Sequence, residues 1–187
     1  MIVVKVGGSL YDWPGLGPAL RGFVASLHPA SILLVPGGGG FADAVRKLHA
    51  VHRLTEGQSH RLALESLWVP MRFLRTLVPG AEYRSHPTPD ATLPVCVLDA
   101  HMFCEYTAPD LPHTWEVTTD SIAARAAVVW QAERLILLKS IDVSPGTPWD
   151  VCAARGWVDG YFTHALAGVA GTVEAVNLRT WGGVRVG

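Results

Sequence analysis

The chain has 187 residues, of which 49% are apolar and 17% charged, and its formal net charge is −1. This composition predicts a single domain over residues 1–187, and the lack of a basic block argues against nucleic acid or an anionic membrane as a partner. No window is apolar enough to span a membrane, and the N-terminus lacks the pattern of a signal peptide. The three cysteines share no metal-ligand spacing, which is typical of reduced thiols. We therefore expect a cytoplasmic protein that handles small molecules.

The chain begins with an apolar run that ends in glycines. Residues 2–6 surround Lys5 with apolar side chains, and Gly7, Gly8 and Ser9 follow at once. This pattern predicts a buried strand that turns sharply. Glycine N–H groups at a strand end can approach an anion closely because no Cβ intervenes, and Lys5, whose head we expect near solvent, adds a positive charge. Alone, such a lysine is more often an ordinary residue beside an ordinary turn.

A second glycine turn follows the next apolar run. A helical stripe over residues 14–27 precedes an apolar strand at 31–35, and Pro36 ends this strand. Four glycines come next: Gly37, Gly38, Gly39 and Gly40. Because apolar residues at helical spacing follow them, we expect these glycines to open a helix and to present a row of N–H groups to an anion. Two such turns in one domain predict a shared phosphate site.

The rest of the chain continues the alternation of helices and strands. Further helices are expected over 58–77, 100–106, 119–130 and 163–169, with Pro70 kinking the first. Further strands are expected at 95–98, 135–138 and 172–176, with a loop at 79–94 and a turn-rich segment at 145–156 that has room for one helical turn. This order predicts an α/β fold, a three-layer α/β/α sandwich with a mainly parallel central sheet. Its strands include 2–6, 31–35, 95–98 and 135–138.

Polar residues in the second half could complete the site. Asp120 lies in the first turn of a predicted helix, where an aspartate is most often a dipole-stabilising residue. Alternatively, Asp120 faces the cleft and orients Lys5 through a charge-assisted hydrogen bond. Lys139 ends a predicted strand, and Ser140 and Asp142 follow it. Ligands of open α/β sheets bind outside the carboxyl ends of the strands, so Lys139 is either a ligand-binding residue or a solvated one.

The eight histidines are scattered along the chain. His49 and His52 are near helical spacing but lack a third ligand, so no metal site built by the protein is expected. Four others could contact a substrate, although histidines so placed are more often surface or satisfied residues: His60, His86, His101 and His113. Trp115 is the tryptophan nearest a motif.

The motifs occur in an order that resembles the amino acid kinase superfamily, which includes acetylglutamate, aspartate, uridylate and isopentenyl phosphate kinases. The resemblance rests on Lys-Val-Gly-Gly-Ser at 5–9, the glycines after Pro36, Thr-Asp-Ser at 119–121 and the strand segment 135–142. The short length and residues 111–124 most resemble the small kinases of methanofuran biosynthesis. Those enzymes phosphorylate [5-(aminomethyl)furan-3-yl]methyl phosphate to its diphosphate.

The resemblance implies an α/β/α sandwich and a homo-oligomer, with the acceptor near the N-terminal glycines and ATP, carrying Mg²⁺, towards the C-terminal part. Lys5 would stabilise the transferring phosphoryl group, and Asp120 would hold Lys5 in place. Phosphate oxygens would be bound by the N–H groups of Gly7, Gly8, Gly38 and Gly39. The other expected nucleotide-binding residues are Ser9, Gly37, Gly40, Ser121, Lys139, Ser140 and Asp142.

The chain departs from these relatives after the nucleotide strand, where many of them show Asp-x-x-Gly but residues 141–146 do not. Many of them carry a second transition-state lysine after the nucleotide strand, but residues 145–171 contain no lysine. Lys139 is the remaining candidate on that side. Two alternatives therefore stay open: a related kinase acting on isopentenyl phosphate, UMP or a carboxylate, or a non-catalytic nucleotide- or oxyanion-binding protein. A carboxylate acceptor would ask for an arginine near Gly40, and three are available: Arg46, Arg53 and Arg61.

Overall fold

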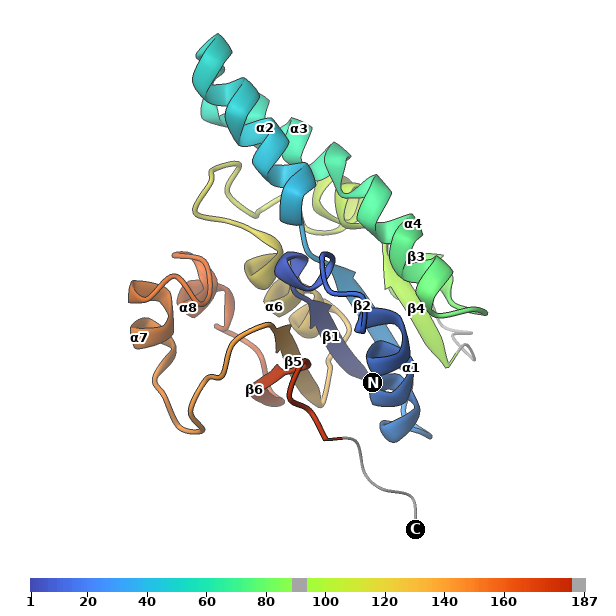
Figure 1. Cartoon of the computed structure of the whole chain (residues 1–187). Helices are drawn as coiled ribbons and strands as arrows, with labels where there is room; N and C mark the ends of the chain where they lie inside the picture. Colours follow the sequence, from blue (N-terminus) through green and yellow to red (C-terminus); the bar gives the residue numbers. More distant parts are fainter. Residues whose placement is uncertain (89–93, 183–187) are drawn as a thin grey trace.

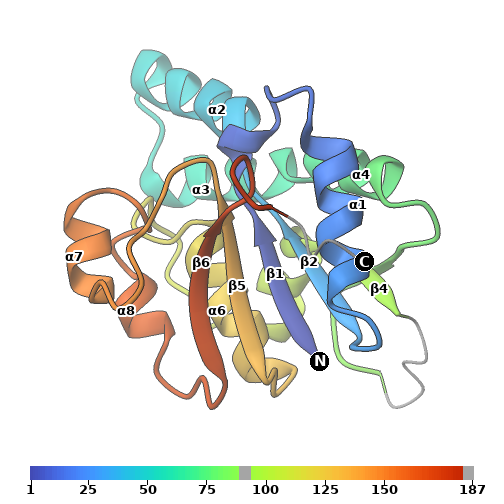
Figure 2. The same ribbon diagram turned by 60° about the horizontal axis from the view of Figure 1, so that its bottom comes forward.

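The computed structural model describes residues 1–88 and 94–182. Its centre is a six-stranded sheet in the order β3-β4-β2-β1-β5-β6, and every pair of neighbouring strands is parallel. The strands are β1 (Ile2–Val6), β2 (Ile32–Pro36), β3 (Glu82–Arg84), β4 (Val95–Leu98), β5 (Arg134–Lys139) and β6 (Thr172–Asn177). Figure 2 shows β1 in the middle of the sheet, between β5 and β2. The predicted parallel sheet and its four named strands are confirmed, with ends that differ by one residue.

Helices cover both faces of the sheet, which confirms the three-layer arrangement (Figures 1 and 2). The longer ones are α1 (Leu16–Ser26), α2 (Gly39–His52), α3 (Glu56–Ser66), α4 (Trp68–Leu77) and α6 (Thr119–Val129). The short ones are α5 (Ala100–Met102), α7 (Trp149–Ala154), α8 (Phe162–Ala165), the 3₁₀ turn η1 (Gly8–Leu10) and the π-helical turn η2 (Phe103–Thr107). In the part of the chain that the structure describes, no helix is both long enough and apolar enough to cross a membrane.

The sheet is buried on both faces, which explains why its strands read as continuous apolar runs. Successive side chains of a strand point to opposite faces. In β1, Val3 therefore joins the cluster under α6, and Val4 joins the cluster under α1 and α4. Leu135 and Ile136 divide between the same two clusters in β5.

Two local expectations are wrong. Pro70 does not kink a long helix, because the break lies at Leu67, which ends α3 and caps α4. Pro70 instead occupies the first turn of α4, where its missing N–H has no intrahelical acceptor to lose. The predicted loop at 79–94 contains the edge strand β3, whose residues are partly exposed and too few to show a periodic pattern.

The parallel sheet places the chemistry at one edge. The carboxyl ends of β1, β2 and β5 lie side by side, because β1 pairs with both neighbours in parallel register. The chain order changes direction here, since β2 lies on one side of β1 and β5 on the other. Such a switch point is where open α/β sheets bind ligands.

Candidate functional site

The two glycine turns meet at the ends of β1 and β2, as the sequence predicts. A Cβ on Gly37 would lie 2.4 Å from the backbone nitrogen of Gly8 and 2.6 Å from the carbonyl oxygen of Val6. The Tyr11 hydroxyl, in the segment after the first turn, donates a 2.9 Å hydrogen bond to the Gly37 carbonyl. The two turns therefore pack backbone against backbone, and only glycine fits at their contact.

The N–H groups of the turns differ in their availability. The Gly7 N–H donates a 2.8 Å hydrogen bond to the Leu138 carbonyl, so the expectation that it binds phosphate is wrong. This bond extends the pairing of β1 with β5 beyond the last strand residue. Within residues 1–88 and 94–182, the N–H groups of Gly8, Gly38 and Gly39 donate no hydrogen bond to another residue. They lie around the N-terminus of α2 and remain free for an anion.

A cavity of about 390 Å³ opens over the turns. Lys5, Asp120 and Lys139 line it together with Gly8 and Gly39. Its other walls come from α2 and α3, from the segment before α6, and from Ile141, Gly156 and Trp157. Gly37 and Gly40 are not among the residues that line the cavity, and their contact with nucleotide stays a prediction. Gly37 makes the contact between the turns.

Asp120 bridges two lysines that come from neighbouring strands. Its Oδ1 lies 2.8 Å from Nζ of Lys5 and 2.8 Å from Nζ of Lys139. Lys139 also donates a 2.9 Å hydrogen bond to Oδ2. The three residues are only 5–8% exposed, so the expectation of a Lys5 head near solvent and the alternative of a solvated Lys139 are both wrong.

The three charges perturb one another. Burial alone would raise the pKa of Asp120, but the two lysines hold that pKa below its ordinary value. Burial, followed by the charge of Lys5, lowers the pKa of Lys139 to about 8, against the opposing effect of Asp120. With both lysines protonated, one carboxylate faces two ammonium groups. The net positive charge at the end of the glycine turns favours an anionic ligand.

The helix that carries Asp120 is capped from a distant segment. Asp159 Oδ2 accepts hydrogen bonds from Thr118 N (2.9 Å), Thr118 Oγ1 (2.7 Å) and Ser121 N (3.0 Å). The Ser121 hydroxyl donates to Oδ1 of the same carboxylate. Ser121 is therefore part of the helix cap and does not line the cavity, which corrects its expected contact with nucleotide. Sequence reasoning missed Asp159, because a cap supplied from 38 residues away leaves no local pattern.

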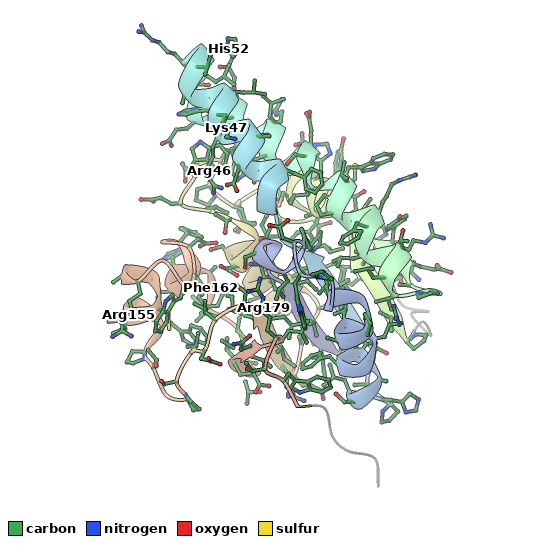
Figure 3. All side chains as sticks on the ribbon, in the orientation of Figure 1. Arg46, Lys47, His52, Arg155, Phe162 and Arg179 are labelled. Carbon is green, nitrogen blue, oxygen red and sulfur yellow. The ribbon has the colours of Figure 1, made fainter. Side chains whose placement is uncertain are left out.

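The residues after the strand ends divide into two groups. Ser9 and Ser140 line the cavity, and their hydroxyls lie 2.8 Å apart. Asp142 does not line it and accepts a 3.0 Å hydrogen bond from Asn177 at the end of β6, and its nucleotide contact stays a prediction. Arg179, labelled in Figure 3, donates a 3.2 Å hydrogen bond to the Ser9 carbonyl.

Aromatic and cationic side chains also line the cavity. The Arg46 guanidinium of α2 lies 4.8 Å from the Trp115 ring centre, and His49 meets the same indole edge-on (Figure 3 labels Arg46). His60 of α3 also lines the cavity and stacks on His113, with ring centres 5.3 Å apart. His60 is only 3% exposed, so its interpretation as a surface residue is wrong.

The remaining candidates lie outside this cavity. His86 and His101 do not line it, and of the three arginines that kept a carboxylate acceptor open, only Arg46 does. A second hollow of about 410 Å³ lies between the loop 143–147 and β6. In the described ranges, no group of three or more His, Cys, Asp or Glu side chains could hold a metal ion.

Comparison with known proteins gives one similar sequence and many similar folds. No family model matches the chain. The [5-(aminomethyl)furan-3-yl]methyl phosphate kinase of Methanocaldococcus jannaschii is 26% identical over 152 residues, which are 76% of this chain and 67% of that protein.

Three solved structures share the fold. The uridylate kinase from Archaeoglobus fulgidus superposes with a TM-score of 0.64 at 14% identity and covers 95% of this chain and 92% of its own. The UMP kinases from Ureaplasma parvum and Bacillus anthracis give TM-scores of 0.61 and 0.59 at 12% and 14% identity. They cover 95% and 97% of this chain and 89% and 88% of their own. The chain therefore shares its fold with uridylate and UMP kinases and part of its sequence with a furan phosphate kinase, in agreement with the predicted resemblance to the amino acid kinase superfamily.

Proposed function

We propose that the chain is an ATP-dependent kinase that transfers the γ-phosphoryl group to the phosphate of a small acceptor. The acceptor we propose is [5-(aminomethyl)furan-3-yl]methyl phosphate, and the product is its diphosphate. One observation carries the kinase proposal: Lys5 and Lys139 share Asp120 at the point where two glycine turns with free N–H groups meet. The acceptor is taken from the similar protein of Methanocaldococcus jannaschii.

Phosphoryl transfer asks a protein for positioning and charge neutralisation. An oxygen of the acceptor phosphate attacks the γ-phosphorus, the bond to the β,γ-bridging oxygen breaks, and ADP leaves. Negative charge on the transferring oxygens is stabilised by the two buried ammonium groups and by the N–H groups of Gly8, Gly38 and Gly39. Because the acceptor phosphate is already anionic, the reaction needs no general base.

Lys139 supplies the second cation in this proposal. Relatives place that lysine in a later glycine-rich segment, but here the strand β5 carries one that reaches the same carboxylate as Lys5. Asp120 positions both, since each Nζ lies 2.8 Å from Oδ1. A lysine in a strand and a lysine in a loop can therefore serve the same purpose, provided that both ammonium groups face the γ-phosphate.

Magnesium would be carried by the nucleotide and not by a protein cage. The described residues include no acidic cluster, and both oxygens of Asp120 are taken by lysines. Free N–H groups and lysines suit the phosphate oxygens of such a complex. When bound, Mg²⁺ neutralises part of the phosphate charge.

We also propose that the protein associates with copies of itself. The support is an exposed set of large apolar side chains on α3 and α4: Leu62, Trp68 and Val69. Apolar surface of this kind is costly to leave in water. Light scattering after size exclusion tests the assembly, and a monomer at micromolar concentration would contradict it.

The kinase proposal is tested by ADP release with Mg-ATP and a panel of acceptors. The panel contains [5-(aminomethyl)furan-3-yl]methyl phosphate, its unphosphorylated alcohol, isopentenyl phosphate, UMP and a carboxylic acid. We expect acceptor-dependent ADP release with the furan phosphate and a diphosphate product in the mass spectrum. If ADP is released with another acceptor and not with the furan phosphate, that acceptor is the substrate and the proposed one is wrong. Nucleotide binding without turnover on any acceptor would favour a non-catalytic binding protein.

A further inference from the structure

His60 is a buried polar residue in an apolar part of the cavity. Its neighbours on that wall are apolar: Ala63, Leu64, Leu67, Val117 and Ile122. His60 is 3% exposed, and its Nδ1 finds no hydrogen-bond partner in the described chain. A buried polar atom without a partner costs free energy, so such an atom beside a cavity points to a ligand.

The surroundings of His60 decide whether its ring is charged or neutral. Burial and the charge of His113 lower the pKa of His60 to about 4, while a hydrogen bond to the Val117 backbone opposes them. The ring is therefore neutral at pH 7. Of its two ring nitrogens, Nδ1 is the buried one without a hydrogen-bond partner in the described chain. A neutral ring protonated on Nε2 leaves a lone pair on Nδ1, which can accept a hydrogen bond but not donate one.

We propose that His60 selects the acceptor by receiving, at Nδ1, a hydrogen bond from an amine or hydroxyl group on the body of the acceptor. The inference rests on the proposed function, because it places the acceptor phosphate at the lysines and the rest of the acceptor between them and α3. The substrate class is then a small phosphate ester with a mostly apolar body and one hydrogen-bond donor. A neutral imidazole accepts from an ammonium group without adding a repelling charge.

The same geometry rejects esters that lack a donor. When an ester without a donor binds, the buried Nδ1 of His60 stays without a hydrogen bond. The free energy lost in this way separates the two kinds of ester more strongly than the loss of an apolar contact would. Isopentenyl phosphate has no donor on its hydrocarbon body and would leave Nδ1 unpaired.

The test compares two esters that differ in this donor. Calorimetry without ATP gives the Kd of [5-(aminomethyl)furan-3-yl]methyl phosphate and of (5-methylfuran-3-yl)methyl phosphate. We expect the wild type to prefer the amine by roughly ten-fold, the value of one hydrogen bond of about 1.4 kcal/mol. In His60→Leu the preference should vanish because only the amine ester binds more weakly. His60→Asn should keep part of the preference for the amine ester, because its amide oxygen can accept a hydrogen bond. This variant is used in place of His60→Leu if His60→Leu does not fold.

A matched control is His52→Leu, which changes an exposed histidine at the far end of α2 (Figure 3). It should leave both Kd values unchanged. A preference that survives in His60→Leu, an equal loss for both esters, or a wild type that binds neither ester would each overturn the inference.

ADP release in the same samples separates this inference from the kinase proposal. If the protein prefers the amine ester through His60 but releases no ADP, the proposed kinase function is wrong and the selection of the acceptor by His60 stands. Turnover of the two esters with equal Kd values would keep the function and overturn the selection.

Discussion

Gly8 lies so close to Gly39 that a Cβ on Gly8 would be 2.2 Å from the Gly39 backbone nitrogen. Real Cβ contacts are not this short, and the group in the way is backbone, which cannot swing aside as a flexible side chain can. The first turn therefore forms part of the surface against which the N-terminus of α2 packs. The free N–H groups of both turns keep their relative positions only while Gly8 has no side chain.

Gly8→Ala should lower the free energy of unfolding by about 1–3 kcal/mol, the usual cost of overpacking, and should weaken nucleotide binding as the turns separate. Urea unfolding and calorimetry with ATP measure the two effects. Gly40→Ala is the matched control, because nothing lies within 4 Å of its Cβ position. It should stabilise the first turn of α2 by up to about 1 kcal/mol. Equal stability of the two variants would contradict the packing argument.

Lys5→Met should reduce turnover by two to three orders of magnitude, about 3–4 kcal/mol of barrier at 1.36 kcal/mol per tenfold. The fold should survive, although Lys5 is buried, because Asp120 keeps its pair with Lys139 and Met fills much of the space. Steady-state ADP release measures the change. Lys47→Met removes an exposed lysine of α2 and should leave turnover intact. Near-normal turnover in Lys5→Met would sink the proposed mechanism.

Asp120→Asn should be the most destabilising change at the site. It leaves two buried ammonium groups without their carboxylate, and breaking a buried pair in this way costs about 3–5 kcal/mol. The loss should be smaller at pH 9 than at pH 7, because Lys139, whose pKa is already lowered to about 8, can give up its proton. Urea unfolding at the two pH values tests this. A loss that is independent of pH would mean that charge repulsion is not the cause.

Local patterns in the sequence were sufficient for the sheet and the glycine turns. The strand runs are apolar because both faces of the sheet are covered, and each is long enough to stand out. The strand β3 could not be recognised in the sequence, because it has only three residues and lies at the edge of the sheet. The sequence also indicated that Asp120 could reach Lys5, but not that Lys139 would reach the same carboxylate.

The missed features depend on contacts between distant segments. Asp159 caps α6 from beyond α7, and the buried His60 stacks on His113, which lies in a distant segment of the chain. Gly7 lost its expected role for a similar reason, since its N–H is taken by β5. None of these pairings leaves a periodic or adjacent signal in the sequence.

His60 should make the protein less stable in mild acid. Its pKa is lowered from the ordinary 6.5 to about 4 in the folded chain. Between these two pH values His60 is protonated in the unfolded chain but neutral in the folded chain. The free energy of unfolding therefore falls as the pH drops from 6.5 towards 4, and His60 has no effect on it above pH 6.5. His60→Leu should flatten this part of a stability profile measured by urea unfolding, whereas His52→Leu should not. An unchanged slope in His60→Leu would assign the acid sensitivity to other groups.

Lys139→Met should stabilise the protein while it destroys activity. Because the pKa of Lys139 is lowered from the ordinary 10.5 to about 8, the folded chain holds this proton less tightly than the unfolded chain does, and the charge costs stability at pH 7. Removing it should raise the melting temperature at pH 7, and the advantage should shrink from pH 8 to 10.5 as wild-type stability rises.

If Lys139 is the second cation of the reaction, turnover of Lys139→Met should fall about 100-fold or more with little change in the KM for ATP. A raised KM with normal turnover would mean that Lys139 only holds the nucleotide. Scanning calorimetry and ADP release on one preparation, with Lys47→Met as the control, separate these outcomes.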